Sequence, residues 1–310
     1  MSIIRDAVNR PQIEIIVLNW NNYKDTKECL SSLQILNYPC FEVVLVDNGS
    51  PDRSGEKLAK EFPEFIFLQT GKNLGYAGGN NVGIRYAIEK GADIILVLNN
   101  DVVVESADLL TQISMTMKES NKIGIVGPRI YDFVDRQRRV DRYDESIFYR
   151  WIDLVGLKLK KRVWKTQNGI TLRTVDRVSG SAIAFSRDML KKVGLFDDRF
   201  FLYAEEIDLC FRTVLAGYEI VHIDDDKVCA FHKSKVGYVP PMVWYYITRN
   251  TLHLINKQFI GLKWSLIFIL HIVVVMNRAS MLILNRSFKG AKYCLTGFRD
   301  GLMGKIGQKV

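Results

Sequence analysis

Short apolar segments that alternate with helical patterns constrain the fold of this chain more than any other feature. Four segments have the aliphatic and β-branched composition of buried strands: 13–18, 41–46, 65–68 and 94–98. Between them, apolar residues recur at helical spacing over 24–36, 54–62 and 82–90. Strands that alternate with short helices predict an α/β domain, with a mostly parallel, Rossmann-like sheet and helices on both faces.

Polar residues follow each of these strands, in the clusters Asn19, Asp47-Asn48, Asn73 to Asn81 and Asn99-Asn100-Asp101. Because ligands gather at the carboxyl ends of strands in open α/β sheets, the sequence predicts one site at this edge. The run 73–81 predicts a flexible loop that approaches a phosphate-bearing ligand, through Gly75, Gly78, Gly79 and Asn80. It lacks the G-x-G-x-x-G fingerprint, so a dinucleotide-dependent oxidoreductase is poorly supported.

Asp101 and His232 are candidate ligands for one divalent cation, Mg²⁺ or Mn²⁺, with substrate phosphates completing the shell. The alternative for His232 is a core histidine. Glu205 and Glu206 open a predicted helix, where the helix dipole favours acidic residues in any case. One of them is also a candidate general base, which would accept the proton of an attacking hydroxyl. Asp47-Asn48 forms either a simple turn or a contact to a nucleotide base or ribose.

The net charge of +9 is unevenly distributed. Between Arg136 and Lys165 ten basic residues face four acidic ones, which forms either a solvated face or a surface for an acidic partner such as a pyrophosphate, an anionic lipid or a nucleic acid. No nucleic-acid-binding motif accompanies it, so we expect no nucleic acid partner. The five scattered cysteines predict reduced thiols in a cytosolic setting, and the polar N-terminus predicts no secretion signal.

Residues 262–284 are strongly apolar but are interrupted by Asn277 and Arg278. Because an arginine near the centre of a bilayer costs at least ~2.5 kcal/mol, an interfacial or re-entrant helix fits better than a simple span. The basic residues after position 284 are suited to bind an anionic cytoplasmic membrane surface. A buried helix pair of a soluble protein is the alternative.

Taken together, the motifs resemble the inverting family 2 glycosyltransferases of GT-A fold, and within them the rhamnosyltransferase-like branch. The similarity covers roughly residues 12–236. It rests on six motifs in order: 17–21, 46–50, 73–83, 98–101, 194–209 and Phe231-His232.

The resemblance implies an enzyme that transfers a sugar from a nucleoside diphosphate to an acceptor hydroxyl with inversion. It implies that Asp47 and Asn48 hold the base, with Leu18 and Asn19 beside them. Asn99, Asn100 and Asp101 would bind ribose and metal. The first aspartate of that family motif is Asn99 here, so Asp101 would carry the metal together with His232. The Glu-Asp pair of the family is Glu205-Glu206 in this chain. The resemblance therefore assigns the role of general base to Glu206. Because a glutamate replaces the aspartate of the family at this position, it stays open whether Glu205 or Glu206 is the base.

The predicted organisation is a nucleotide-sugar-binding half over 12–120, an acceptor-binding and catalytic half over 121–236, and a helical, membrane-associated region over 237–310. The expected acceptor is a polyprenyl-pyrophosphate-linked saccharide at the cytoplasmic face of the membrane. The favoured donor is dTDP-rhamnose, with a UDP-hexose or UDP-N-acetylhexosamine as alternatives. A decayed sugar-nucleotide-binding module is disfavoured because Asp101, Glu206 and His232 are all present.

Overall fold

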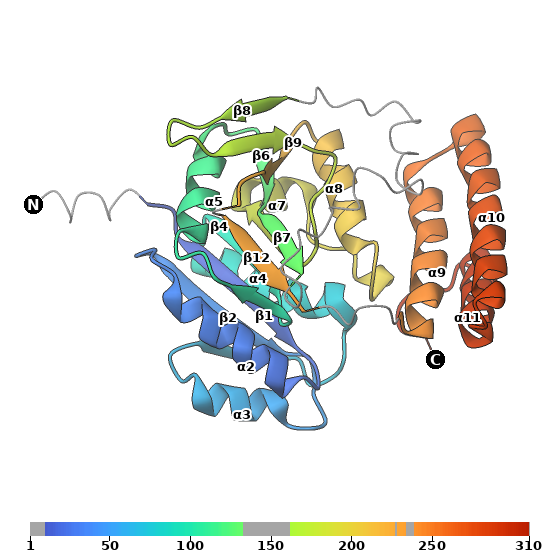
Figure 1. The fold of residues 1–310 in the computed structure, drawn as a ribbon, viewed down its shortest axis with the longest axis horizontal. Coiled ribbons are helices and arrows are strands. Elements are labelled where there is room, and N and C mark those ends of the chain that lie inside the picture. The colour runs from blue at the N-terminus through green and yellow to red at the C-terminus, as the bar shows by residue number, and fades with distance from the viewer. Residues whose placement is uncertain (1–9, 133–161, 227, 234–238, 310) are drawn as a thin grey trace, which may run out of the picture.

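The computed structural model describes residues 10–132, 162–226, 228–233 and 239–309 (Figure 1). The first part of the chain contains β1 (Ile13–Asn19), α2 (Tyr23–Ser32), the 3₁₀ helix η1 (Leu33–Ile35), β2 (Phe41–Asp47), α3 (Ser54–Glu61), β3 (Ile66–Gln69), α4 (Gly75–Lys90) and β4 (Ile94–Asn99). These elements confirm the predicted alternation of strands and helices.

The second part contains β5 (Val102–Val104), α5 (Leu109–Lys118), β6 (Ile123–Gly127), β7 (Arg129–Asp132), β8 (Val163–Lys165), β9 (Thr171–Thr174), β10 (Ala182–Ser186), α7 (Arg187–Val193), the 3₁₀ helix η2 (Asp198–Phe200), α8 (Glu205–Leu215), β11 (Glu219–Ile223) and β12 (Cys229–His232). The basic stretch 136–165 lies outside the described residues except for its last four. Those four lie in or next to β8, which forms a hairpin with β9 at the edge of the sheet.

One sheet joins the strands of both predicted halves in the order β3-β2-β1-β4-β10-β6-β11-β9-β8. Strands β1 to β4 are parallel to one another, and β10 runs antiparallel between β4 and β6. Helices cover both faces, as predicted: α2 and α5 pack into one apolar core, and α4, α7 and α8 pack into the other. The central strands are buried on both sides, which explains their nearly continuous apolar sequences.

A separate three-stranded sheet has the order β5-β12-β7. Strand β12 pairs antiparallel with β5, and His232 lies opposite Val102. Because Asp101 immediately precedes β5, this pairing brings the end of β12 to the carboxyl edge of the large sheet. The small sheet therefore joins two motifs that are far apart in the sequence.

The predicted loop over residues 73–81 is wrong, because α4 begins at Gly75. Its glycines permit close packing of the helix on the sheet. A Cβ at Gly79 would lie 2.6 Å from Leu18 Cδ1, and one at Gly83 would lie 2.5 Å from Ile16 Cγ2. Because Gly79 and Gly83 have no side chains, the regular helix α4 can pack closely on β1.

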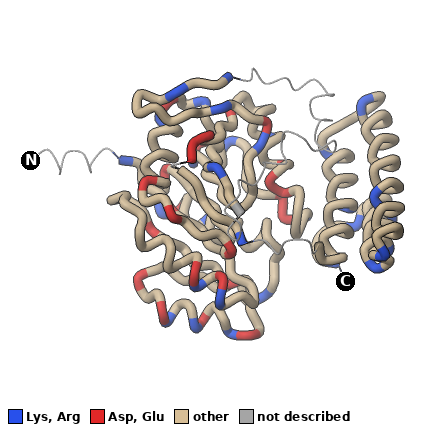
Figure 2. Tube along the Cα trace, in the orientation of Figure 1, with Lys and Arg blue, Asp and Glu red and all other residues tan. Residues whose placement is uncertain are grey.

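The C-terminal region consists of α9 (Pro241–Gln258), α10 (Gly261–Leu284) and α11 (Phe288–Leu302), which pack side by side next to the α/β domain (Figure 1). The expected apolar helix over 262–284 is thus present as α10. Residues 237–310 contain ten Lys and Arg and a single acidic residue, Asp300. Figure 2 shows the resulting contrast with the α/β domain, where acidic and basic residues are mixed.

Candidate active site

The tips of β1 and β2 form a hydrogen-bonded turn at the carboxyl edge of the sheet. Asn19 and Asp47 are register partners, and Asn19 Nδ2 donates to Asp47 Oδ1 (2.7 Å) and to Ser54 Oγ (2.8 Å). Gln69 Nε2 and the Ser50 backbone N–H donate to the other Asp47 oxygen at 2.8 and 3.1 Å. Both Asn19 and Asp47 are buried, with at most 1% of their surface exposed. They therefore fix the turn that follows β2.

Asn48 and Gly75 connect this turn to the start of α4. Asn48 Nδ2 donates to the Gly75 carbonyl (3.0 Å), and its Oδ1 accepts from the Leu74 backbone N–H (3.0 Å). Gly75 has a φ of +75°, and a Cβ there would clash with the carbonyl oxygen of Phe201. A glycine at this position thus lets the segment before α8 approach the start of α4.

The tip of β4 joins the same network. Asn100 Nδ2 donates to Thr26 Oγ1 (2.7 Å), which donates to Asn19 Oδ1 (2.9 Å). Asn99 Oδ1 and Asn80 Oδ1 are buried and have no hydrogen-bond partner among the described residues. Since buried acceptors are almost always paired in folded proteins, these two oxygens are available for a ligand.

Leu18, Gly78 and Gly79 form the packing layer between β1 and α4. Leu18 lies directly under Gly79, and a Cβ at Gly78 would press against the Leu74 side chain (2.9 Å). Gly78 and Gly79 are buried inside the helix. The structure therefore places these three residues beneath the predicted site, and gives them no exposed loop through which to cradle a phosphate.

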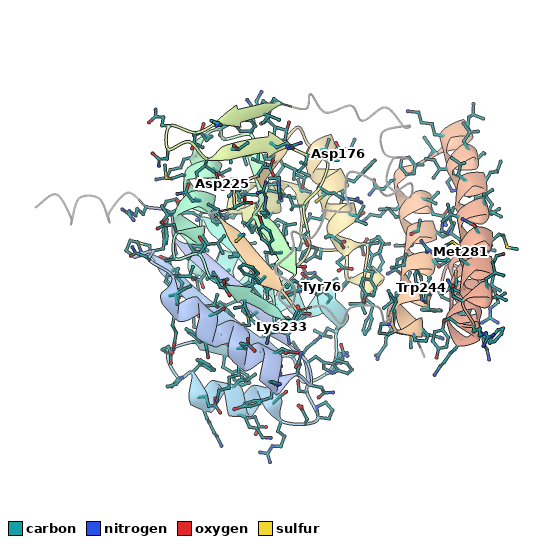
Figure 3. The ribbon with its side chains drawn as sticks, in the orientation of Figure 1. Tyr76, Asp176, Asp225, Lys233, Trp244 and Met281 are labelled. Atoms are coloured by element: carbon teal, nitrogen blue, oxygen red, sulfur yellow. The ribbon has the colours of Figure 1, made fainter. Side chains whose placement is uncertain are left out.

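Asp101 and His232 lie together, as the sequence predicted. His232 Nε2 is 3.3 Å from Asp101 Oδ1, and both side chains are largely buried. The Lys233 backbone N–H donates to the Asp101 carbonyl (2.8 Å), which fixes the two strand ends against each other. Figure 3 shows Lys233 and Tyr76 on the same side of the α/β domain. Within the described residues no cluster of three or more His, Cys, Asp or Glu is suited to a metal. One carboxylate and one imidazole are a donor set that fits Mn²⁺ or Mg²⁺ if phosphate oxygens supply the remaining ligands.

Glu205 and Glu206 are the first residues of α8, at the same edge of the sheet. Glu206 Cγ lies 3.5 Å from where a Cβ of Gly180 would be, and the Gly180 carbonyl accepts a hydrogen bond from Tyr76 Oη (2.8 Å). Glu205 is 4% exposed, and its Oε2 has no hydrogen-bond partner among the described residues. Glu206 therefore lies against the segment that leads into β10, and Glu205 is buried beside it at the start of α8.

The electrostatic environment of this pair favours protonated carboxyls. Burial raises the pKa of Glu205 well above its ordinary value, and the charge of Glu206 raises it further. Burial also raises the pKa of Glu206, against the opposing effect of backbone N–H groups and Arg177. Burial raises the pKa of Tyr203 to about 12, with further contributions from Glu205, Glu206 and Asp101. The charges of Glu205, Glu206 and Asp101 thus all raise the pKa of Tyr203. Raised carboxyl pKa values are typical of general bases and acids.

The segment before α8 is strained. Phe201, Tyr203 and Ala204 all have positive φ angles, between 64° and 77°. Such conformations cost on the order of 1–3 kcal/mol for each residue and persist only where surrounding contacts enforce them. Sequence reasoning missed this strain and also missed Tyr76 and Tyr203. The tyrosines lie inside motifs 73–83 and 194–209, so their positions within those motifs were the available signal.

Comparison with known proteins places the chain in a family. The family model described as glycosyl transferase family 2 matches residues 14–194, more than half of the chain. A low-salt glycan biosynthesis hexosyltransferase, Agl10 of Haloferax volcanii, is 29% identical over 72% of this chain and 68% of its own length. The dTDP-rhamnosyl transferase RfbF of Shigella flexneri is 24% identical over 82% of this chain and 83% of its own. An N-acetylglucosaminyl-diphospho-decaprenol L-rhamnosyltransferase of Mycobacterium tuberculosis is 26% identical over 74% of this chain and 78% of its own.

A solved structure shows the same fold. It is a mannosyltransferase from Pyrobaculum calidifontis in complex with GDP-mannose and Mn²⁺, with a TM-score of 0.59, 16% identity, and coverage of 96% of this chain and 89% of its own. The resemblance drawn from the sequence motifs is confirmed, and so is the GT-A fold. The chain belongs to glycosyltransferase family 2 and is a sugar-transferring enzyme.

Proposed function

We propose that this enzyme transfers rhamnose from dTDP-rhamnose to a hydroxyl of a polyprenyl-pyrophosphate-linked saccharide, with inversion, at the cytoplasmic face of the membrane. The observation that carries the proposal is the position of Glu205 and Glu206 at the start of α8: Glu205 is buried, and Glu206 Cγ lies 3.5 Å from where a Cβ of Gly180 would be, just before β10. Two of the relatives bear rhamnosyltransferase names, and one of these names includes a decaprenol-diphosphate sugar.

In this proposal, Glu206 is the general base. Its carboxylate accepts the proton of the acceptor hydroxyl while that oxygen forms a bond to the anomeric carbon. The bond between the anomeric carbon and the diphosphate breaks on the opposite side, which inverts the configuration and releases the nucleoside diphosphate. Glu205 is the more deeply buried of the two, and the charge of Glu206 raises its pKa further, so Glu205 stays protonated while Glu206 acts as the base.

Asp101 and His232 would hold the divalent cation. The ion would neutralise charge on the leaving diphosphate. The free acceptors Asn99 Oδ1 and Asn80 Oδ1 support donor binding at the same edge of the sheet. The buried network around Asn19, Asp47 and Asn48 keeps the base-binding turn in one conformation, which lowers the entropy cost of binding the nucleotide.

The C-terminal helices support the membrane part of the proposal. By length and composition α10 could cross a bilayer, with a mean hydropathy of 2.1. However, α9 and α11 pack against it, and these helices contain buried polar residues, among them Arg249, Asn250 and Asp300. Only the outer face of α10 is exposed, and most of its exposed residues are apolar: Leu262, Leu266, Ile269, Leu270, Val273, Met276, Met281, Ile283 and Leu284, with Lys263, Asn277 and Ser280 as the polar ones.

A helix with one free apolar face and polar helices behind it is suited to lie in the plane of the membrane surface. Nine of the ten basic residues of the region, all but the buried Arg249, favour an anionic leaflet, because each contributes about 1 kcal/mol of attraction when it lies near the surface. We therefore propose peripheral attachment through α10. A polyprenyl-linked acceptor would then be presented from the same surface.

The test is a donor panel with purified full-length protein, Mn²⁺ or Mg²⁺, and an N-acetylglucosaminyl-diphospho-polyprenol acceptor in detergent. The readout is release of nucleoside diphosphate. We expect dTDP-rhamnose to give the highest rate, and Glu206→Gln to abolish release while dTDP binding survives. A higher rate with UDP-glucose, UDP-galactose or UDP-N-acetylglucosamine would refute the rhamnose assignment. A fully active Glu206→Gln variant would refute the assigned base.

A further inference from the structure

The strained segment before the catalytic pair is held by a side chain from the C-terminal region. Asn250 lies on α9 and is 1% exposed. Its Nδ2 lies within hydrogen-bond distance of three carbonyl oxygens of that segment, which share its two hydrogens: those of Phe200 (2.9 Å), Leu202 (2.8 Å) and Tyr203 (2.7 Å). One side-chain amide therefore fixes the backbone that immediately precedes Glu205.

A second side chain orients Asn250. Arg249 Nε donates to Asn250 Oδ1 (2.9 Å), so the amide nitrogen must face the carbonyls. Arg249 Nη2 also donates to the Phe200 carbonyl (3.0 Å), and its guanidinium lies over the rings of Tyr245 and Tyr246. The amide that holds the segment is thus itself fixed by a buried arginine.

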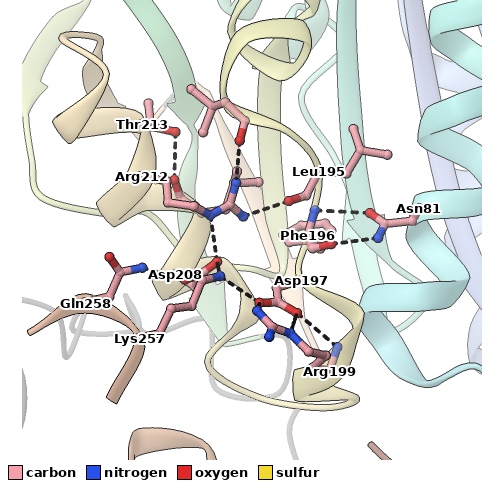
Figure 4. Close-up of polar contacts among 12 residues, drawn as sticks. Asn81, Leu195, Phe196, Asp197, Arg199, Asp208, Arg212, Thr213, Lys257 and Gln258 are labelled. Carbon is pink, nitrogen blue, oxygen red and sulfur yellow. Dashed lines mark hydrogen bonds and ion pairs between the residues drawn. The ribbon is translucent and has the colours of Figure 1, made fainter. Parts of the chain in front are cut away.

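The same helix also holds α8 at a second place. Lys257 Nζ and Gln258 Nε2 donate to the buried Asp208 carboxylate at 2.9 and 2.7 Å, and Lys257 also contacts Asp197 (2.7 Å). Figure 4 shows this network, in which Arg212 completes the contacts to Asp208 (2.8 Å). Helix α9 therefore contacts both the segment that precedes α8 and the first turn of α8.

We propose that Asn250 is a positioning residue for the transfer reaction: it keeps residues 200–204 in the conformation that places the Glu205-Glu206 pair. The inference rests on the proposed function of that pair. The positive φ angles of Phe201, Tyr203 and Ala204 are conformations that residues with a Cβ rarely adopt, so the segment relaxes when the contacts that enforce it are removed. Among the described residues, Asn250 makes no hydrogen bond to Asn19, Asp47 or Asn48 at the tips of β1 and β2.

The variants Asn250→Asp and Asn250→Ala test this role. The first has the same shape but no hydrogen to donate, and it places an anionic oxygen against three carbonyls. Asn250→Ala removes the amide without adding a charge, and it provides the test if Asn250→Asp does not fold. Because a misplacement of about 1 Å at a reacting group costs roughly 100-fold, we expect kcat to fall about 100-fold. The Kd for dTDP and UDP and the KM for the donor should stay within about threefold.

Tyr245→Phe is the matched control. Tyr245 is also buried on α9, and its hydroxyl donates to Asp300 (3.0 Å) without touching residues 200–204. We expect this variant to keep kcat within about threefold at a Tm similar to that of the Asn250 variants. Retention of wild-type kcat by both Asn250 variants would overturn the proposal. So would a parallel loss of kcat, nucleotide affinity and Tm, since that pattern indicates only a role in folding.

Hydrogen–deuterium exchange separates this proposal from the proposed function. In Asn250→Ala, amide exchange should accelerate over residues 200–206 and stay unchanged over 94–99. Absence of that local acceleration would overturn the positioning role, whatever the activity. If the wild-type protein releases no nucleoside diphosphate from any donor, the proposed function fails, and the exchange result still decides whether Asn250 holds the segment.

Discussion

Glu14 lies at the amino end of β1, at the opposite end of the strand from Asn19, and it makes the stability of the protein depend on pH. Its side chain is 1% exposed, and its Oε2 has no hydrogen-bond partner among the described residues. The pKa of Glu14 is raised from 4.5 to about 7, mainly by burial and also by the neighbouring Glu42 on β2. At about 1.4 kcal/mol per pH unit, this shift corresponds to about 3 kcal/mol.

The sign follows from proton binding. Between pH 4.5 and about 7 the folded protein binds a proton at Glu14 that the unfolded chain has released, so stability falls as the pH rises through this window. The full loss of folding stability caused by ionised Glu14 is present above about pH 7, and it is absent below pH 4.5. We therefore expect Glu14→Gln to gain up to about 3 kcal/mol relative to wild type on going from pH 4.5 to pH 8.

The measurement is urea unfolding of wild type and Glu14→Gln in detergent, followed by tryptophan fluorescence at pH 5 and pH 8. Glu89→Gln is the matched control, because Glu89 is exposed on α4. The difference in free energy of unfolding between Glu14→Gln and wild type should increase with pH. A difference that is the same at both pH values, or one that favours the wild type at pH 8, would refute the reasoning. Enzymatic activity should be unchanged, since Glu14 lies far from the carboxyl edge of the sheet.

Three further predictions concern the site and the membrane surface. Glu205→Gln should leave the acidic limb of the rate–pH profile in place, because burial raises the pKa of Glu206 and Glu205 is protonated when Glu206 ionises; a shift of the limb by more than about one pH unit would contradict this assignment. His232→Ala should raise the Mn²⁺ concentration for half-maximal nucleoside diphosphate release at least tenfold, and an unchanged Mn²⁺ titration would argue against the metal site. The double variant Ile269→Lys, Val273→Lys should weaken co-sedimentation with anionic vesicles at least tenfold, because each fully buried aliphatic side chain contributes about 1.5–3 kcal/mol. Unchanged binding would exclude α10 as the attachment surface.

The tips of the central strands were predictable because strand and turn are local patterns. Asn19, Asp47 and Asn99 each end an apolar segment, and parallel pairing necessarily brings such ends to one edge. The meeting of Asp101 with His232 was predicted from their places at the ends of two strands, and the family resemblance implied the same pair. It depends on the pairing of β5 with β12, which joins distant segments through backbone hydrogen bonds that leave no periodic signal in either sequence.

Two features could not be read from the sequence, for physical reasons. A glycine-rich sequence over 75–79 is compatible with a mobile loop and also with a tightly packed helix. The close packing of this segment on Leu18 distinguishes the two, and it is visible only in the structure. Likewise, no pattern in the C-terminal sequence predicts that the side chain of Asn250 contacts residues 200–203. Its three acceptors are backbone carbonyls, and any sequence supplies these.

The exposed face of α10 also determines how the protein behaves once it is removed from the cell. Leu262, Leu266, Ile269, Val273 and Met276 lie on a single helix face with nothing covering them in the described chain. In plain aqueous buffer such a face will pair with the same face of a second molecule or collect detergent, because contiguous exposed apolar surface drives association. Apparent oligomeric states and kinetic constants should therefore be compared only between samples prepared with the same amphiphile.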